Sequence, residues 1–184
     1  MGRVLAKRAL IAHPDCSSPK ISVGCKVSQF GRDALKLEYV MTGAVDRILI
    51  SKSSIPTRTD GLWDATCFEL FLAHLDGSYV EFNFAPSQDW ASYRFESYRS
   101  DMAPALDLRQ PDIFVEQSEQ RFALTAYAEL PPNELDSMVS LALCAVIEEV
   151  DGTKSYWALK HPPGPPDFHH PDCFVLHLGA PDKA

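Results

Sequence analysis

The stretch Thr66-Cys-Phe-Glu-Leu-Phe-Leu-Ala-His-Leu-Asp-Gly-Ser-Tyr-Val-Glu-Phe-Asn-Phe84 carries the strongest fold signal in the chain. Its first half, 66–74, is apolar at both odd and even positions except for Glu69, which predicts a central strand covered on both faces. Asp76-Gly77 is a turn signal. The residues after it, 79–85, alternate between apolar and polar side chains. The stretch therefore predicts a β-hairpin at the centre of a sheet.

Short segments of the same kind follow one another along the rest of the chain. They are 21–27, 35–41, 48–50, 90–98, 113–116, 122–130, 139–150, 156–160 and 174–178. Such strands, separated by turn residues and lacking a sustained 3.6-residue period, predict an all-β protein. We expect an antiparallel two-sheet β-sandwich of the jelly-roll or immunoglobulin-like kind, forming one domain over residues 1–184. The predicted core consists of Phe68, Leu70, Leu72, Phe82, Phe84, Leu124, Leu141 and Leu143.

Composition and charge narrow the classes of function. The 184 residues carry a formal net charge of −8 and no basic patch, so we expect neither nucleic acid nor a membrane surface as a partner. No apolar run approaches the ~18 residues of a membrane span, and the N-terminal segment lacks a signal-peptide core, which predicts a cytoplasmic protein. The 5 cysteines include no Cys-x-x-Cys pair, which is typical of reduced thiols rather than of a disulfide framework.

Glu69 is the first candidate for function. A carboxylate inside an apolar strand loses hydration at a cost on the order of several kcal/mol unless something pairs with it. One explanation is an internal ion pair with Arg58 or Arg94. The other is that Glu69 faces a groove and accepts hydrogen bonds from a ligand, with Asn83 beside it on the neighbouring strand and the two arginines as further contacts. Glu81 would share that polar face.

The three tryptophans are candidate ligand platforms. Trp63 follows Asp60-Gly61 and Trp90 follows 86–89, so both are expected near loops, where a flat apolar ring can stack on a sugar. A core position is the alternative for each. Trp157 has Leu159 in phase with it, as expected of a core residue. It and Tyr156 remain candidate ligand contacts.

The C-terminal loop carries a further set of polar side chains. We expect 162–166, which is rich in proline, to stiffen a loop whose Lys160, His161, Asp167 and His169 line the mouth of a pocket. The alternative is a metal site, because two or three imidazoles with Asp167 and Cys173 can bind zinc, although their spacing matches no common site.

Enzyme signatures are absent from the sequence. It contains no G-x-S-x-G elbow, P-loop, dinucleotide-binding glycine motif or HExxH. We therefore expect a non-catalytic module that binds a small ligand, without a cofactor or a metal. Two alternatives stay open: a metal-assisted hydrolase built on His161, Asp167 and His169, and a protein-interaction domain without a small ligand.

Three segments together resemble the DOMON-like domains. They are Arg58-Thr-Asp-Gly-Leu-Trp63 through Cys67-Phe-Glu69; Tyr79-x-Glu81-x-Asn83-x-x-Pro86-Ser87-x-x-Trp90-x-x-Tyr93-x-Phe95; and Tyr156-Trp-Ala-Leu-x-His161 with Pro166-Asp-Phe-His169. The resemblance extends from about residue 9 to residue 178. DOMON-like domains are related to family 9 carbohydrate-binding modules, which are β-sandwiches.

This resemblance implies ligand binding rather than catalysis, with sugar or haem as the ligand. Carried over by position, it places stacking aromatic rings at Trp63 and near Tyr156 and Trp157, with polar contacts from Glu69 and Asn83. Haem-binding relatives commonly use a Met/His axial pair, and no methionine here aligns with that role. The resemblance therefore favours a saccharide or a sugar-containing metabolite.

Overall fold

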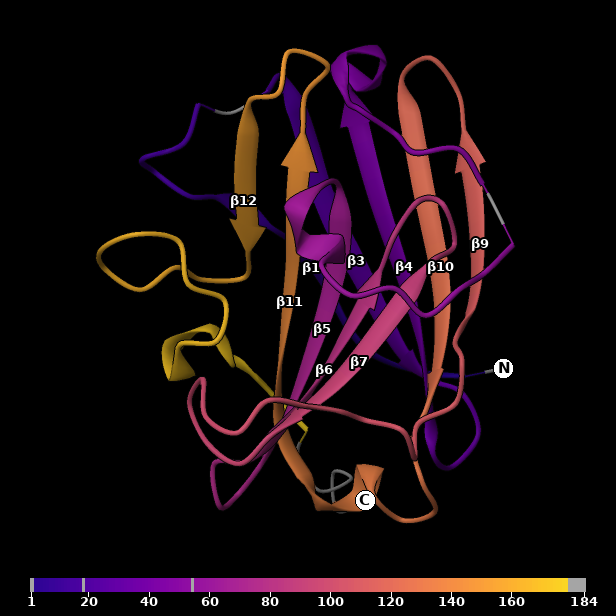
Figure 1. Ribbon diagram of the computed structural model, residues 1–184, viewed down its shortest axis with the longest axis vertical. Coiled ribbons are helices and arrows are strands. Elements are labelled where there is room, and N and C mark those ends of the chain that lie inside the picture. The colour runs from indigo at the N-terminus through magenta and orange to yellow at the C-terminus, as the bar shows by residue number, and fades with distance from the viewer. Residues whose placement is uncertain (1, 18, 54, 179–184) are drawn as a thin grey trace.

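Two antiparallel β-sheets pack face to face in the computed structural model (Figure 1). The structure describes residues 2–17, 19–53 and 55–178, so the predicted domain 1–184 extends beyond the described residues at both ends. Every pair of described neighbouring strands is antiparallel. The all-β sandwich predicted from the alternation of apolar residues is confirmed.

Each sheet is defined by its strand order. Sheet A contains, in order, β1 (Arg3–Ala9), β3 (Ile21–Gln29), β4 (Ala34–Gly43), β10 (Arg121–Glu129) and β9 (Asp112–Gln117). Sheet B contains β2 (Ile11–Ala12), β12 (Lys154–Ala158), β11 (Met138–Glu148), β5 (Cys67–His74), β6 (Tyr79–Phe84), β7 (Trp90–Phe95) and β8 (Ala103–Pro104). A last strand, β13 (Leu176–His177), pairs with β11.

Helical structure in the described residues is limited to four 3₁₀ turns. They are η1 (Val45–Arg47), η2 (Leu62–Asp64), η3 (Leu135–Ser137) and η4 (Pro171–Cys173). No helix among the described residues has the length and apolar character needed to cross a membrane.

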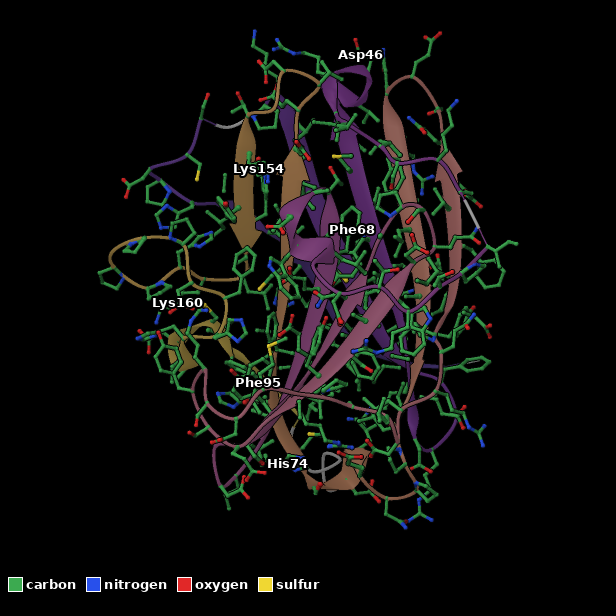
Figure 2. The ribbon with its side chains drawn as sticks, in the orientation of Figure 1. Asp46, Phe68, His74, Phe95, Lys154 and Lys160 are labelled. Carbon is green, nitrogen blue, oxygen red and sulfur yellow. The ribbon has the colours of Figure 1, made fainter. Side chains whose placement is uncertain are left out.

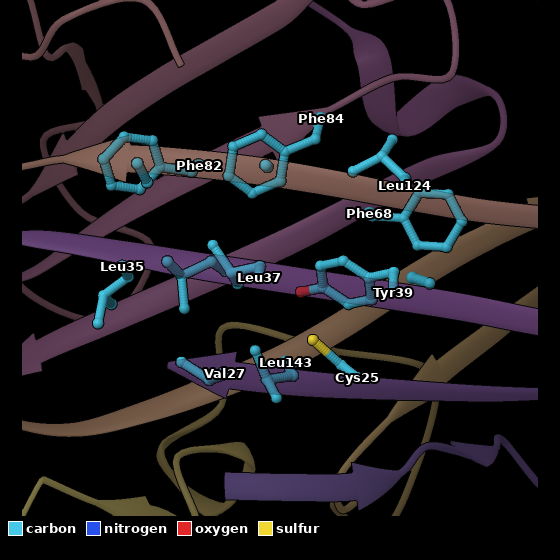
Figure 3. Packing of buried hydrophobic residues seen from close by; sticks show 14 of the residues in the cluster. Cys25, Val27, Leu35, Leu37, Tyr39, Phe68, Phe82, Phe84, Leu124 and Leu143 are labelled. Atoms are coloured by element: carbon cyan, nitrogen blue, oxygen red, sulfur yellow. The ribbon is translucent and has the colours of Figure 1, made fainter. Parts of the chain in front are cut away.

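The core lies between the two sheets. All eight residues predicted for it are buried, which confirms that part of the prediction. Figure 3 shows Phe68 near Tyr39 and Leu124, and the ring of Phe68 stacks on Phe122 with a centroid separation of 5.7 Å. The hydroxyl of Tyr39 donates a 2.6 Å hydrogen bond to the backbone carbonyl of Glu69. This bond joins sheet A to β5 and satisfies a phenol that would otherwise be buried without a partner.

The two-residue strands β2 and β8 were not predicted, and two further differences concern longer segments. The predicted strand 48–50 is reduced to a single bridge between Ile48 and Glu149, because the chain turns through η1 as it crosses from sheet A to sheet B. The edge strand β1 was not predicted, because its Arg3, Lys7 and Arg8 interrupt the apolar alternation. Charged residues are typical of an exposed edge strand.

Candidate functional site

Sheet B has a second covered face, opposite the core. The hairpin β5–β6 places Glu69 beside Asn83, and Phe71 beside Glu81, on this outer face. Alternation along the strands makes this placement necessary, because Phe68, Leu70 and Leu72 of β5 occupy the inner face. Three polypeptide segments reach the outer face: the loop that contains η2, the segment 96–102 after β7, and the segment 159–173 that follows β12 and lies beside β11 (Figure 1).

A cavity of about 370 Å³ lies between these segments and sheet B. Its walls combine acidic, basic and aromatic side chains from both sheet and loops: Trp63, Asp64, Glu69, Glu81, Phe95, Arg99, Met102, Val146, Lys154, Tyr156, Pro166, Phe168 and His169. Figure 2 labels two of them, Lys154 on β12 and Phe95 at the end of β7. The volume is near the lower end of the ~300–1,000 Å³ common for small-molecule sites.

Glu69 lies at the floor of the cavity with only 3% of its surface exposed. Within the described part of the chain, its carboxyl group has no hydrogen-bond partner and no ion pair. Burial, together with the negative charge of Glu81, raises the pKa of Glu69 well above its usual value. The group is therefore a buried carboxyl group that favours its protonated form and opens toward the cavity.

Glu81, the second carboxyl group of the floor, is held in place by its neighbours. Asn83 donates a 2.7 Å hydrogen bond from Nδ2 to Oε1 of Glu81, and Nε2 of His169 lies 3.9 Å from Oε2. Burial raises the pKa of Glu81 to about 7, although the Asn83 bond and the charge of Arg99 oppose that rise. Asn83 thus fixes the orientation of a carboxyl group that titrates near neutral pH.

His169 forms part of the same wall and stays neutral at physiological pH. Its Nδ1 lies 2.8 Å from the hydroxyl of Tyr79. Burial and the nearby positive charge of Arg99 lower the pKa of His169 to about 4. Its contact with Glu81 is therefore no ion pair above about pH 4, since the imidazole carries no charge there.

Aromatic rings form the sides of the cavity. Trp63, in η2, is 37% exposed and packs edge-on against Tyr93 with ring centroids 5.8 Å apart. Across the cavity, Tyr156 packs against Phe168 at 6.1 Å. The guanidinium carbon of Arg58 lies 5.4 Å from the centre of the Tyr93 ring, so Arg58 supports the Trp63 loop from outside the lining.

The loop that brings Arg99 to the cavity is tied to the C-terminal segment. Arg99 forms an ion pair with Asp167, in which Nη2 and Oδ1 are 2.8 Å apart, and Tyr98 donates a hydrogen bond to the same carboxylate. The backbone amide of Arg99 donates to the hydroxyl of Tyr79 at 3.2 Å. These contacts hold one wall of the cavity in position and neutralise much of the charge of Arg99.

Several residues predicted from the sequence meet at this cavity. Trp63, Glu69, Tyr156 and His169 line it. Three more lie outside the lining and contact it. Asn83 donates a hydrogen bond to Glu81, and Asp167 pairs with Arg99. Arg58 contacts Tyr93, which packs against Trp63. The proposed internal ion pair of Glu69 with Arg58 or Arg94 is not formed, because Arg58 binds Asp60 and Arg94 binds other carboxylates.

Other predicted residues lie elsewhere. Trp90 and Trp157 are part of the core between the sheets, because each falls on the inward-facing positions of its strand. Arg94 forms ion pairs with Asp107 and Glu134. Lys160 pairs with Asp172 on the surface, and Nε2 of His161 contacts the carbonyl of Ile11 at 2.8 Å.

The metal alternative gains no support from this geometry. The three side chains proposed for it have different partners: His161 faces β2, Asp167 binds Arg99, and His169 contacts Tyr79. No group of three or more His, Cys, Asp or Glu side chains in the described ranges is arranged to hold a metal ion.

Sequence reasoning missed several residues of the lining. Glu81 was expected on the polar face but was not named as a ligand contact, although it alternates with Phe82 in the same register as Asn83. Arg99 and Met102 carried no signal, since they lie in a segment without periodicity whose position depends on Asp167 and Tyr79. Phe168 and Lys154 likewise reach the cavity through the path of a loop and the end of a strand.

Comparison with known proteins places the fold. No model of a known protein family matches the chain, and a search of curated proteins finds no match. A crystal structure from Bacteroides uniformis ATCC 8492, provisionally described as a carbohydrate-binding protein, superposes with a TM-score of 0.56 at 13% identity, covering 92% of this chain and 84% of that one. A family 9 carbohydrate-binding module from Caldicellulosiruptor kristjanssonii, solved with cellotriose, gives a TM-score of 0.49 at 10% identity over 89% and 75% of the two chains. The chain therefore has a fold like that of the Bacteroides protein.

Proposed function

We propose that this protein binds a saccharide or a sugar-containing metabolite in the cavity on the outer face of sheet B, without converting it chemically. The observation that carries the proposal is the pairing of exposed Trp63 with buried Glu69, whose carboxyl group has no partner among the described residues. Both side chains line one cavity.

The chemistry of a sugar ring suits these walls. One face of a pyranose is apolar and stacks on an aromatic ring, and its hydroxyl groups need both donors and acceptors. Trp63 and Tyr156 offer the aromatic surface, Glu69 and Glu81 offer acceptors, and Lys154 and Arg99 offer donors. The volume of about 370 Å³ suits a mono- or disaccharide better than a long chain.

The structural comparison supports the proposal. The similar protein from Bacteroides uniformis ATCC 8492 is provisionally described as carbohydrate-binding. Membership of the DOMON-like group is part of the proposal and rests on the resemblance in the segments around Trp63, Asn83 and His161.

A glycan array followed by calorimetry tests the proposal. We expect a mono- or disaccharide ligand that Trp63→Ala binds at least about tenfold more weakly, because aromatic anchors carry much of the energy at such sites. Phe114→Ala is the matched control, since Phe114 is an exposed aromatic residue on sheet A. A blank array at millimolar sugar, together with specific capture of a protein, would favour the protein-interaction alternative. Recovery of cleaved sugar would contradict binding without turnover.

A further inference from the structure

The charges around the cavity are unevenly distributed. Its two cations are already engaged: Arg99 is paired with Asp167, and Nζ of Lys154 donates a 2.5 Å hydrogen bond to the backbone carbonyl of Asp64 at the rim. The floor holds Glu69 and Glu81, whose strands are adjacent in sheet B. Among the described residues, no cation forms an ion pair with Glu69, and Glu81 is within 4 Å of one positively chargeable group, His169, which is neutral near pH 7.

The missing partner of Glu69 points to a ligand. A carboxyl group that is almost fully buried is unfavourable unless it is hydrogen-bonded, and buried polar groups in native proteins nearly always are. Glu69 opens toward the cavity, so a molecule bound there can supply its partner. A hydroxyl group would supply one hydrogen bond, whereas an ammonium group supplies up to three donors and a compensating charge.

The aromatic walls favour the same kind of ligand. Trp63, Phe95, Tyr156 and Phe168 line the same cavity as the two carboxyl groups. The faces of such rings carry negative electrostatic potential and attract cations, most strongly where water is excluded. Carboxylates and aromatic rings in one cavity form a site suited to a protonated amine attached to a partly apolar body.

We infer that the cavity selects an amine-bearing saccharide, with its ammonium group against Glu69 and Glu81 and its ring on Trp63. The inference rests on the proposed function, because it names the class of sugar that the same cavity takes. A site for neutral sugars would differ, because Glu69 would there form hydrogen bonds only with hydroxyl groups.

Protonation links this selectivity to pH. Several titratable groups face the two carboxyl groups: Cys67 of β5, Cys144 of β11, Tyr79 of β6, Tyr93 of β7, and Arg99 and His169 of the loops. Burial raises the pKa of Glu69 and of Glu81, the latter to about 7. An ammonium ligand binds the ionised carboxylates, so binding releases protons below that pH. As long as the amine itself stays protonated, its affinity therefore rises as the pH rises from 5 toward 7 and Glu81 ionises.

Calorimetry with three matched sugars tests the inference on the unmodified protein. The probes are the β-1,4-linked dimers of glucosamine, glucose and N-acetylglucosamine, titrated at pH 5 and pH 7. We expect the glucosamine dimer to bind about ten- to a hundredfold more tightly than the other two at pH 7, as expected for hydrogen bonds to charged groups. Glu69→Gln and Glu81→Gln should remove this preference. Glu116→Gln, an exposed glutamate of sheet A, should keep it.

The outcomes separate the inference from the proposed function. Equal affinity for the three dimers overturns the selectivity and leaves saccharide binding intact. A preference for the amine that survives both glutamine variants overturns the assignment to Glu69 and Glu81. If none of the three dimers binds, the inference fails; a blank glycan array would then count against saccharide binding itself.

Discussion

Replacing Glu81 with glutamine should change how the stability of the protein depends on pH. In the folded protein, burial raises the pKa of Glu81 from 4.5 to about 7. A carboxyl group with a raised pKa contributes stability that is present in full below pH 4.5 and is lost as pH rises through about 7. The amide of glutamine has nearly the same shape, can still accept the hydrogen bond from Asn83, and does not titrate.

The size of the effect follows from the two pKa values. Each pH unit between them corresponds to about 1.4 kcal/mol, so ionisation of Glu81 lowers the free energy of unfolding by about 3 kcal/mol between pH 4.5 and pH 7. Any packing change caused by the amide is the same at all pH values. We take the free energy of unfolding of the variant relative to that of the unmodified protein. This difference should therefore be about 3 kcal/mol more favourable to the variant at pH 8 than at pH 4.

Urea unfolding at pH 4 and pH 8 measures this difference directly. In thermal melts it corresponds to a relative rise of about 6–12 °C for a chain of this length. Glu116→Gln serves as the control, because Glu116 is largely exposed on sheet A and should show no such pH dependence. A difference between the two pH values below about 0.5 kcal/mol for Glu81→Gln would refute the reasoning, since ordinary surface substitutions produce as much.

Further predictions concern the cavity, the core and the C-terminal loop. Trp63→Ala should change the free energy of unfolding by no more than about 0.5 kcal/mol relative to the unmodified protein, as surface substitutions do. A larger decrease, measured by urea unfolding, would place Trp63 in the core. Glu69→Gln should not show the ~3–5 kcal/mol loss that follows removal of one partner of a buried ion pair, whereas a large drop in melting temperature would reveal a hidden cation. Phe68→Ala should cost ~3–5 kcal/mol in the same assay, and a near-neutral result would contradict the packing against Tyr39 and Phe122. Protein purified without a His tag should contain no stoichiometric zinc in elemental analysis, because His161 faces Ile11; bound zinc would revive the hydrolase alternative.

The fold could be predicted from the sequence because it depends on local alternation. The pattern around Phe68 and Phe82 specifies which side chains face inward, and a shift by one residue would expose all of them. The order of the strands in each sheet could not be predicted. Neither could the passage of the chain from β1 in sheet A to β2 in sheet B, since these short, charged edge strands carry little periodicity.

The candidate site could be predicted only where strand alternation decides it. Glu69 and Asn83 were placed correctly on one face because they are cross-strand neighbours in the β5–β6 hairpin. Trp90 shows the opposite case: its loop-adjacent position suggested a ligand platform, but it falls on the inner face, whereas the phase with Leu159 correctly indicated a core position for Trp157. Arg99 depends on long-range contacts that no local pattern encodes. The cytoplasmic location and the single-domain organisation stay predictions.

An NMR titration of ¹⁵N-labelled protein tests whether a saccharide binds on the outer face of sheet B. The titrant is the strongest saccharide found on the glycan array. We predict changes in the amide chemical shifts of residues that line the cavity: Trp63, Glu69, Arg99 and His169. Chemical-shift changes confined to sheet A, for example around Tyr127 of β10, or no changes at millimolar sugar, would contradict this prediction.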